Sequence, residues 1–203
     1  MTLHTYRIHI IRHGRTAAND DGRYIGSTDL PLCDEGKKEL EAFKNSGLYP
    51  DIDALYISPM RRCVQTAGII YPDMTPTPVK NLRECNFGRF ENKTANDLKD
   101  DEIFRRWLSG EQGIVPEGGE STPDFIMRSV AAFAAVVEDL MREGIRHSGI
   151  IAHGGTIMSV LSVCGLPERP FSDWMCGSGR GYTLLVTPSI WMRGYKLEVI
   201  GRI

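Results

Sequence analysis

The stretch Ile8-His9-Ile10-Ile11-Arg12-His13-Gly14-Arg15-Thr16 decides the fold of this chain. It opens with a run rich in β-branched residues, which indicates a short buried strand. The strand should end at Arg12-His13-Gly14, because glycine lets the backbone turn sharply. Open α/β sheets bind their ligands at the carboxyl ends of the strands. We therefore expect Arg12 and His13 to lie at a ligand-binding edge.

A second unit of the same kind lies near the other end of the chain. The apolar run at 149–152 leads directly into His153-Gly154-Gly155. Parallel strands end at the same edge of a sheet. The two strand-then-His-Gly units can therefore bring His13 and His153 side by side.

The rest of the chain alternates strand-like and helix-like segments. The spacing of Ile126, Val130, Phe133, Val137 and Leu140 predicts an amphipathic helix that starts at Thr122-Pro123 and ends at Gly144. Further helices are expected over 35–44, 60–70 and 156–164, with one or two short polar ones in 94–109. Strands are expected over 6–11, 53–57, 77–82, 148–152, 182–187 and 195–200.

This alternation predicts an α/β fold: a mostly parallel central sheet with helices on both faces, ending in a C-terminal hairpin with an antiparallel edge strand. Residues 16–34 are expected to form a long loop, and loops of that length inside a compact domain are usually functional. Ser58 and Pro59 fit the N-cap and first position of the next helix. Pro188-Ser189 is expected to turn the chain between the last two strands.

Composition restricts the class of protein. The 203 residues are 41% hydrophobic and 25% charged, which is typical of one globular domain spanning 1–203. The net charge of −2 provides no basic field for nucleic acid or an anionic membrane. No apolar run approaches the ~18 residues of a membrane span, and no signal peptide is recognisable.

The five cysteines are odd in number and contain no Cys-x-x-Cys pair. We therefore expect neither a disulfide framework nor a zinc site, and reduced thiols in a cytoplasmic protein.

The residues at the predicted sheet edge suit phosphoryl chemistry. A lone histidine is more often structural, but His13 and His153 in matching settings are far less common by chance. Neutral imidazole is a good nucleophile towards phosphorus, and arginine offers fork-shaped donors to phosphoryl oxygens. Two histidines could instead hold a metal, yet no carboxylate flanks His13 or His153 at ligand spacing, so no metal is expected.

Two further positions contribute to this interpretation. Arg61 and Arg62 begin a predicted helix, where the macrodipole disfavours cations and an anionic partner would offset that cost. Glu84 follows the third predicted strand and is the candidate for general acid work. Read alone, the arginine pair could be a solvated surface pair and Glu84 a loop glutamate.

Together, these motifs resemble those of the histidine phosphatase (phosphoglycerate mutase-like) superfamily, and most closely its small alpha-ribazole phosphatase-type members. The resemblance spans nearly the whole chain. It rests on Arg12-His13-Gly14-x-Thr16-x-x-Asn19, Gly22-Arg23-Tyr24-x-Gly26-x-x-Asp29-x-Pro31-Leu32, Ser58-Pro59-Met60-Arg61-Arg62-Cys63-x-Gln65-Thr66-Ala67, Leu82-Arg83-Glu84-x-x-Phe87-Gly88, Gly119-Glu120-Ser121 and His153-Gly154-Gly155.

The resemblance implies a metal-independent phosphatase without any organic cofactor, acting on a small phosphorylated substrate. His13 would form a phosphohistidine and Glu84 would serve as general acid and then base. The phosphoryl oxygens would be held by Arg12, Arg62 and His153. Substrate-binding positions carried over in the same way are Asn19, Gly26, Arg61 and Gly154, with Arg62 rather than Arg61 in the phosphate pocket.

Two other functions stay open at this point: a cofactor-dependent phosphoglycerate mutase and a non-catalytic phospho-ligand binder. Mutases of this family carry a long insertion before the Gly-Glu-Ser block, whereas the segment from Gly88 to Gly119 is short and largely polar. A non-catalytic binder would not need Glu84 as a general acid. The sequence does not decide the physiological substrate or whether the protein forms a homodimer. Trp191-Met192 fits either an exposed apolar contact or core packing.

Three positions depart from the family pattern. Arg15 replaces a usual Glu and adds charge near the pocket, which could alter substrate choice. Cys33 replaces a helix-capping Thr and should cap more weakly. Asn92 replaces a Gly, and the turn should survive because asparagine tolerates positive φ.

Overall fold

The computed structural model describes residues 5–203 and contains one seven-stranded sheet in the order β3-β2-β4-β1-β6-β7-β5. The strands are β1 (Tyr6–Arg12), β2 (Ala54–Ile57), β3 (Thr77–Pro78), β4 (His147–Ala152), β5 (Gly165–Leu166), β6 (Gly181–Val186) and β7 (Leu197–Arg202). Strands β1, β2, β3 and β4 are parallel, while β6 runs antiparallel to both β1 and β7. The α/β fold with a mostly parallel sheet and a C-terminal hairpin is confirmed, with the two-residue β5 paired outside β7.

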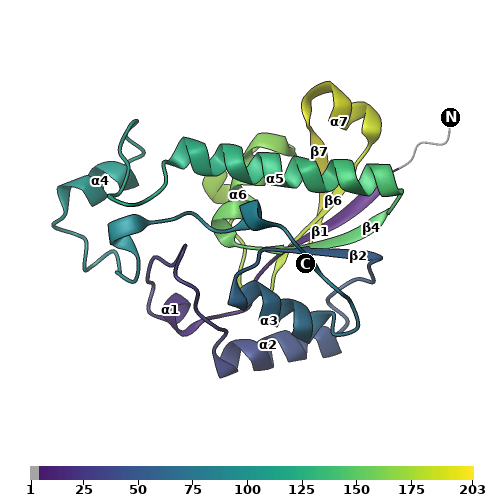
Figure 1. Ribbon diagram of the computed structural model, residues 1–203, viewed down its shortest axis with the longest axis horizontal. Helices are drawn as coiled ribbons and strands as arrows, with labels where there is room; N and C mark the ends of the chain where they lie inside the picture. The colour runs from purple at the N-terminus through teal and green to yellow at the C-terminus, as the bar shows by residue number, and fades with distance from the viewer. Residues whose placement is uncertain (1–4) are drawn as a thin grey trace.

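Helices cover both faces of the sheet (Figure 1). Helices α2 (Asp34–Asn45) and α3 (Arg61–Ile70) pack on one face. Helices α5 (Thr122–Glu143), α6 (Gly154–Cys164) and α7 (Pro188–Gly194) lie on the other. The short α1 (Ala17–Asp20) and α4 (Glu102–Leu108) lie beyond one end of the sheet.

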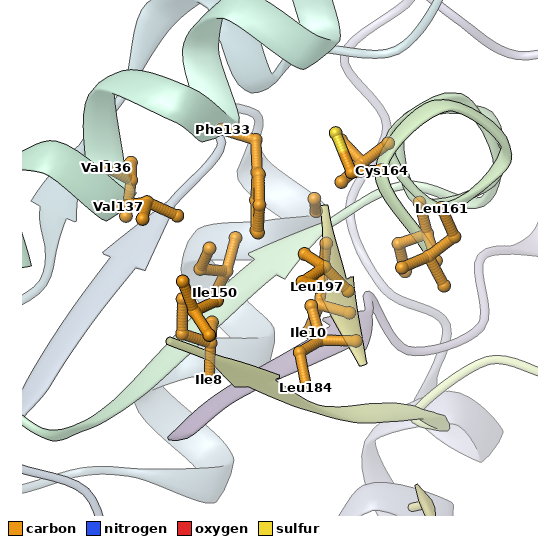
Figure 2. Close-up of a cluster of buried hydrophobic side chains, with 14 of the residues drawn as sticks. Ile8, Ile10, Phe133, Val136, Val137, Ile150, Leu161, Cys164, Leu184 and Leu197 are labelled. Atoms are coloured by element: carbon orange, nitrogen blue, oxygen red, sulfur yellow. The ribbon is translucent and has the colours of Figure 1, made fainter. Parts of the chain in front are cut away.

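The larger core forms between the sheet and α5 and α6. Ile8 and Ile10 of β1 are fully buried against Phe133 and Val137 of α5 and Leu161 of α6 in this cluster, as Figure 2 shows. The predicted apolar stripe of α5 is thus the face that covers the sheet. Buried apolar surface is worth roughly 25 cal/mol per Å², so this packing fixes β1 firmly.

A separate apolar cluster supports the segment beyond the sheet. Phe90, Leu98 and Phe104 are buried there, with Tyr24, Phe87, Ile103 and Trp107 packed around them. Tyr24 lies edge-on to both Phe87 and Trp107, at ring centroid distances of 5.5 and 5.7 Å. The loop after β1 and the segment around α4 are therefore held together by their own small core.

The register of the sheet places the two histidine units level with each other. Arg12 pairs with Ala152 in the β1–β4 ladder, and the backbone N–H of His13 donates to the carbonyl of Ala152 at 3.0 Å. His13 and His153 therefore directly follow the ends of two neighbouring parallel strands, in matching register. The expectation that both lie at one edge of the sheet is confirmed.

Several predicted boundaries differ from those observed. The expected strand over 77–82 is only two residues long and continues as a 3-10 turn from Lys80 to Leu82. The expected loop over 16–34 contains α1, which starts at Thr16 with a capping box. The N-cap of α3 is Met60 rather than Ser58, because the carboxylate of Asp29 from another loop accepts from the Arg61 N–H and replaces a local cap.

The chain between the last two strands forms a helix rather than the predicted turn. Pro188 occupies the first turn of α7, where a missing N–H costs nothing. Trp191 is 2% exposed against Phe133, whereas Met192 is 82% exposed. Within the described residues, no helix has the length and apolar character required to cross a membrane.

Candidate active site

His13 lies just past β1 and is held as a neutral imidazole. Its Nδ1 is 2.7 Å from the carbonyl oxygen of Gly14, which can only accept, so Nδ1 carries the proton. The Nε2 atom therefore keeps its lone pair. Burial and the charge of the neighbouring Arg62 lower the pKa of His13 to about 3, which keeps the ring uncharged near neutral pH.

His153 lies beside His13. Among the described residues, both ring nitrogens of His153 are in polar contacts, unlike those of His13. The two ring centroids are 5.2 Å apart in an edge-on arrangement. Nδ1 of His153 accepts from Nε of Arg62 at 3.1 Å, and Nε2 lies 2.7 Å from Oγ of Ser58. Burial, followed by the charge of Arg62, holds the pKa of His153 well below its usual range.

Arg62 is a cation buried at the start of α3, with only 1% of its surface exposed. Besides His153, its guanidinium donates to the carbonyls of Thr28 and Gly26, each at 2.9 Å. A guanidinium has five N–H donors, so two are left for an anion. Burial lowers the pKa of Arg62, yet arginine stays charged under all ordinary conditions.

Arg12 adds a second guanidinium with donors available. Its Nη1 donates to the carbonyl of Cys176 at 2.8 Å, while in the described part of the chain its buried Nε has no hydrogen-bond partner. A Cβ on Gly154 would lie 3.4 Å from that Nε. A residue without a side chain at 154 therefore keeps the space in front of Arg12 open.

Glu84 is brought to the same place by the start of α6. One carboxylate oxygen accepts from the N–H of Gly155 at 2.9 Å and the other from the N–H of Cys85 at 3.0 Å. Glu84 thus occupies the N-terminal end of α6, and a Cβ at Gly155 would collide with its carboxylate. Burial raises the pKa of Glu84 despite the lowering by these bonds and by Arg62, which favours a protonated acid.

Glu91 organises the loop that receives Arg62. Its carboxylate accepts from the backbone N–H groups of Gly26, Ser27 and Thr28 at 2.9–3.2 Å and from the hydroxyl of Thr28 at 2.6 Å. These bonds lower the pKa of Glu91 against the effect of its burial. Sequence reasoning missed Glu91, since nothing in its local pattern shows that residues 65 positions earlier need an acceptor.

The sequence predicts Ser58 as a helix N-cap, but the structure gives it a different role. It is fully buried and contacts His153 instead of capping α3. The one local signal was its place directly after β2, the same position that His13 and His153 occupy after their strands. That signal could have placed Ser58 at the sheet edge.

The four predicted substrate-binding positions are distributed unevenly. Gly26 and Gly154 adjoin the arginines, through a carbonyl to Arg62 and through the space before Arg12. Asn19 uses Oδ1 to cap α1, accepting from the N–H and hydroxyl of Thr16, which leaves its amide NH₂ as a donor. Arg61 is exposed and is joined to the loop through its backbone N–H on Asp29.

The three departures from the family pattern have simple local explanations. The guanidinium of Arg15 forms an exposed ion pair with Asp20 at 2.6 Å. The thiol of Cys33 caps α2 by accepting from the N–H of Gly36 at 3.3 Å, and Asn92 adopts φ 63°. The positive φ predicted for Asn92 is confirmed, whereas the strength of the Cys33 cap stays a prediction.

A cavity of about 480 Å³ opens beside Glu84. Its wall carries Met60, Arg83, Asn86, Glu120, Asp124 and Arg128, among other residues. Arg128 forms a bidentate pair with Glu120 at 2.8 and 2.7 Å. Within residues 5–203, no three His, Cys, Asp or Glu side chains gather in a way that could hold a metal ion.

A family model described as the histidine phosphatase superfamily (branch 1) matches residues 8–188. The chain belongs to the histidine phosphatase superfamily. An adenosylcobalamin/alpha-ribazole phosphatase of Escherichia coli is 28% identical to this chain over 169 residues, covering 80% of this chain and 81% of that protein. A 2,3-bisphosphoglycerate-dependent phosphoglycerate mutase of Gloeobacter violaceus is 28% identical over 160 residues, covering 75% and 72%.

The fold of this chain is also that of a phosphoglycerate mutase from Bacillus anthracis. The two structures superpose with a TM-score of 0.80 at 18% sequence identity, covering 98% of this chain and 93% of the other. Phosphatases and mutases are thus both among the relatives. The site chemistry has to decide between them.

Proposed function

We propose that this protein is a metal-independent phosphatase that hydrolyses a small phosphomonoester through a phosphohistidine on His13. The observation that carries the proposal is the tautomer of His13: with the proton on Nδ1 and bonded to Gly14, the lone pair of Nε2 is the nucleophile. Its low pKa of about 3 keeps that lone pair free of a proton. Membership of the superfamily supports the same chemistry.

The first step transfers the phosphoryl group to the protein. Nε2 of His13 attacks phosphorus, the bond from phosphorus to the leaving oxygen breaks, and Glu84 gives its proton to that oxygen. Arg12 and Arg62 stabilise the charge that develops on the phosphoryl oxygens. The buried Nε of Arg12 and the two unused N–H groups of Arg62 support this role.

The second step releases phosphate. The Glu84 carboxylate, now without its proton, accepts one from a water molecule. The oxygen of that water attacks phosphorus, the bond from phosphorus to Nε2 breaks, and His13 returns to its neutral form. The raised pKa of Glu84 supports its acting as an acid first and a base second.

The cavity beside Glu84 favours a phosphatase over a mutase. A phosphoglycerate leaving group carries a second acidic group, which needs uncompensated cations. Glu120 and Asp124 lie on the cavity wall, and the charge of Arg128 is matched by Glu120. Arg83 is exposed and directs its Nε to the carbonyl of Lys80. The wall thus carries two cations, Arg83 and Arg128, against the two carboxylates of Glu120 and Asp124, and so has no excess of positive charge. A leaving group such as the nucleoside of an alpha-ribazole phosphate, without a second acid, fits this wall better.

The test is phosphate release from an aryl phosphomonoester in excess EDTA. Wild type should release phosphate, His13→Ala should not, and Glu84→Gln should be slowed most with poor leaving groups because these need protonation. Equal release from wild type and His13→Ala would refute the proposed nucleophile. If neither wild type nor either variant releases phosphate from the substrate, while inorganic phosphate still binds, the protein is a phospho-ligand binder.

A further inference from the structure

Arg62 and the hydroxyl of Ser58 together fix which nitrogen of His153 carries the proton. Nε of Arg62 can only donate, so Nδ1 of His153 must be the acceptor in their 3.1 Å contact. A neutral imidazole has a single N–H, which therefore lies on Nε2 and donates to Oγ of Ser58 at 2.7 Å. His153 thus turns a lone pair, not a donor, towards Arg62.

Ser58 is held in place by the sheet. It follows β2 directly, its backbone N–H donates to the carbonyl of Ile151 at 2.9 Å, and it is fully buried. The only other acceptor near Nε2 of His153 in the described residues is Sγ of Cys63, at 3.6 Å. Sulfur is a weak acceptor, so Ser58 is the partner that holds this tautomer.

This tautomer has a consequence for phosphoryl binding. Phosphoryl oxygens carry only lone pairs, and a lone pair on Nδ1 would repel them. His153 can hold such an oxygen through Nδ1 only after that nitrogen gains a proton, since Nε2–H is already committed to Ser58. The Nε–H of Arg62 is released at the same time and can donate to the anion.

We propose that Ser58 is a positioning residue that couples phosphoryl binding at this site to the uptake of one proton by Nδ1 of His153. The inference rests on the proposed function of the site. One N–H bond forms at Nδ1 with a proton from solvent, and the hydrogen bond from Arg62 to His153 is replaced by bonds from both to the anion. The proton returns to solvent when phosphate leaves.

The charges around His153 agree with this exchange. Arg62, Arg12 and Arg128 disfavour a proton on His153, as do burial and the nearby ring of His13. A phosphoryl dianion adds two negative charges at the same place and reverses the balance. Two other groups there can take up a proton: Glu84 at the start of α6 and His13, whose Nε2 lone pair faces the same anion.

Calorimetric titration with inorganic phosphate tests the coupling. Above pH 7.5 phosphate is mostly the dianion, and buffers of different ionisation enthalpy report the protons taken up. Wild type should take up close to one proton, and its Kd should rise about tenfold per pH unit. Ser58→Ala should lower the uptake and flatten the pH dependence, while Ser58→Thr, which keeps the hydroxyl, should restore both.

Two further variants separate the coupling from other effects. Ser159→Ala removes a buried hydroxyl of α6 that has no hydrogen-bond partner within residues 5–203, and should behave as wild type. Glu84→Gln and His13→Gln should each retain the proton uptake. Nitrogen-15 spectra of labelled histidine should show Nε2–H on His153 in wild type and loss of that fixed tautomer in Ser58→Ala.

The inference and the proposed function fail differently. Phosphate binding without proton uptake, or uptake that disappears in Glu84→Gln or in His13→Gln, overturns the coupling even if the enzyme hydrolyses phosphomonoesters. Failure of phosphate to bind also overturns it. Proton-coupled binding with no turnover of aryl phosphates sustains the coupling and refutes the phosphatase.

Discussion

Replacing Glu91 should weaken both the fold and the site, because this carboxylate holds the loop that receives Arg62. It accepts from the N–H groups of Gly26, Ser27 and Thr28, and from that of Phe87 at 3.1 Å. The carbonyls of Gly26 and Thr28 in turn accept from Arg62. Glu91 touches no reacting atom, so its effect on rate has to pass through this loop.

The size of the effect follows from those bonds. In Glu91→Ala, four backbone donors lose a charged acceptor, and several are open enough for water to replace it. We expect a loss of about 3 kcal/mol in the free energy of unfolding. In Glu91→Gln one acceptor oxygen remains, and we expect a loss of about 2 kcal/mol.

Urea unfolding and kcat/KM on an aryl phosphate are the two measurements. Both Glu91 variants should lower kcat/KM at least tenfold, since misplaced positioning groups commonly cost that much. Glu41→Gln, an exposed change on α2, is the matched control and should alter neither value. If Glu91→Gln has the same free energy of unfolding and the same kcat/KM as wild type, the loop does not depend on this carboxylate.

Four other predictions test separate parts of the structure. His13 has a folded pKa of about 3 against 6.5 unfolded, so the stability it contributes is complete above pH 6.5 and declines as pH falls. By pH 5 the decline is about 2 kcal/mol. The difference between wild type and His13→Gln in urea unfolding at both pH values isolates it, because His153 contributes to the pH dependence of both proteins. Gly155→Ala should displace the Glu84 carboxylate and lower kcat/KM about 10- to 100-fold, whereas Gly68→Ala, where a Cβ meets open space, should not lower it. The rate should also fall with rising pH through the raised pKa of Glu84, and a flat profile from pH 5 to 9 would contradict its role as the acid. Trp191→Ala should cost about 3–5 kcal/mol in urea unfolding because this side chain is buried against Phe133; an unchanged midpoint would show that α7 contributes little to the core.

Much of the fold was predictable because its signals are local. The run before Arg12, the run before His153 and the apolar stripe of α5 each show the period of one element. The position of His13 and His153 at one edge followed from the parallel order of β1 and β4. The boundaries that were wrong depend on distant partners: Asp29 caps α3, and Phe133 gives α7 its buried face.

The sequence by itself determined the residue types that phosphoryl chemistry needs and the strands that carry two of them. It did so because hydrophobic period and glycine turns act over a few residues. Only the tertiary structure decided the protonation and orientation of those residues. The tautomer of His153, the donors left on Arg62 and the raised pKa of Glu84 each depend on atoms from segments far apart in the chain. Burial and hydrogen bonding across such distances exist only once the chain has folded.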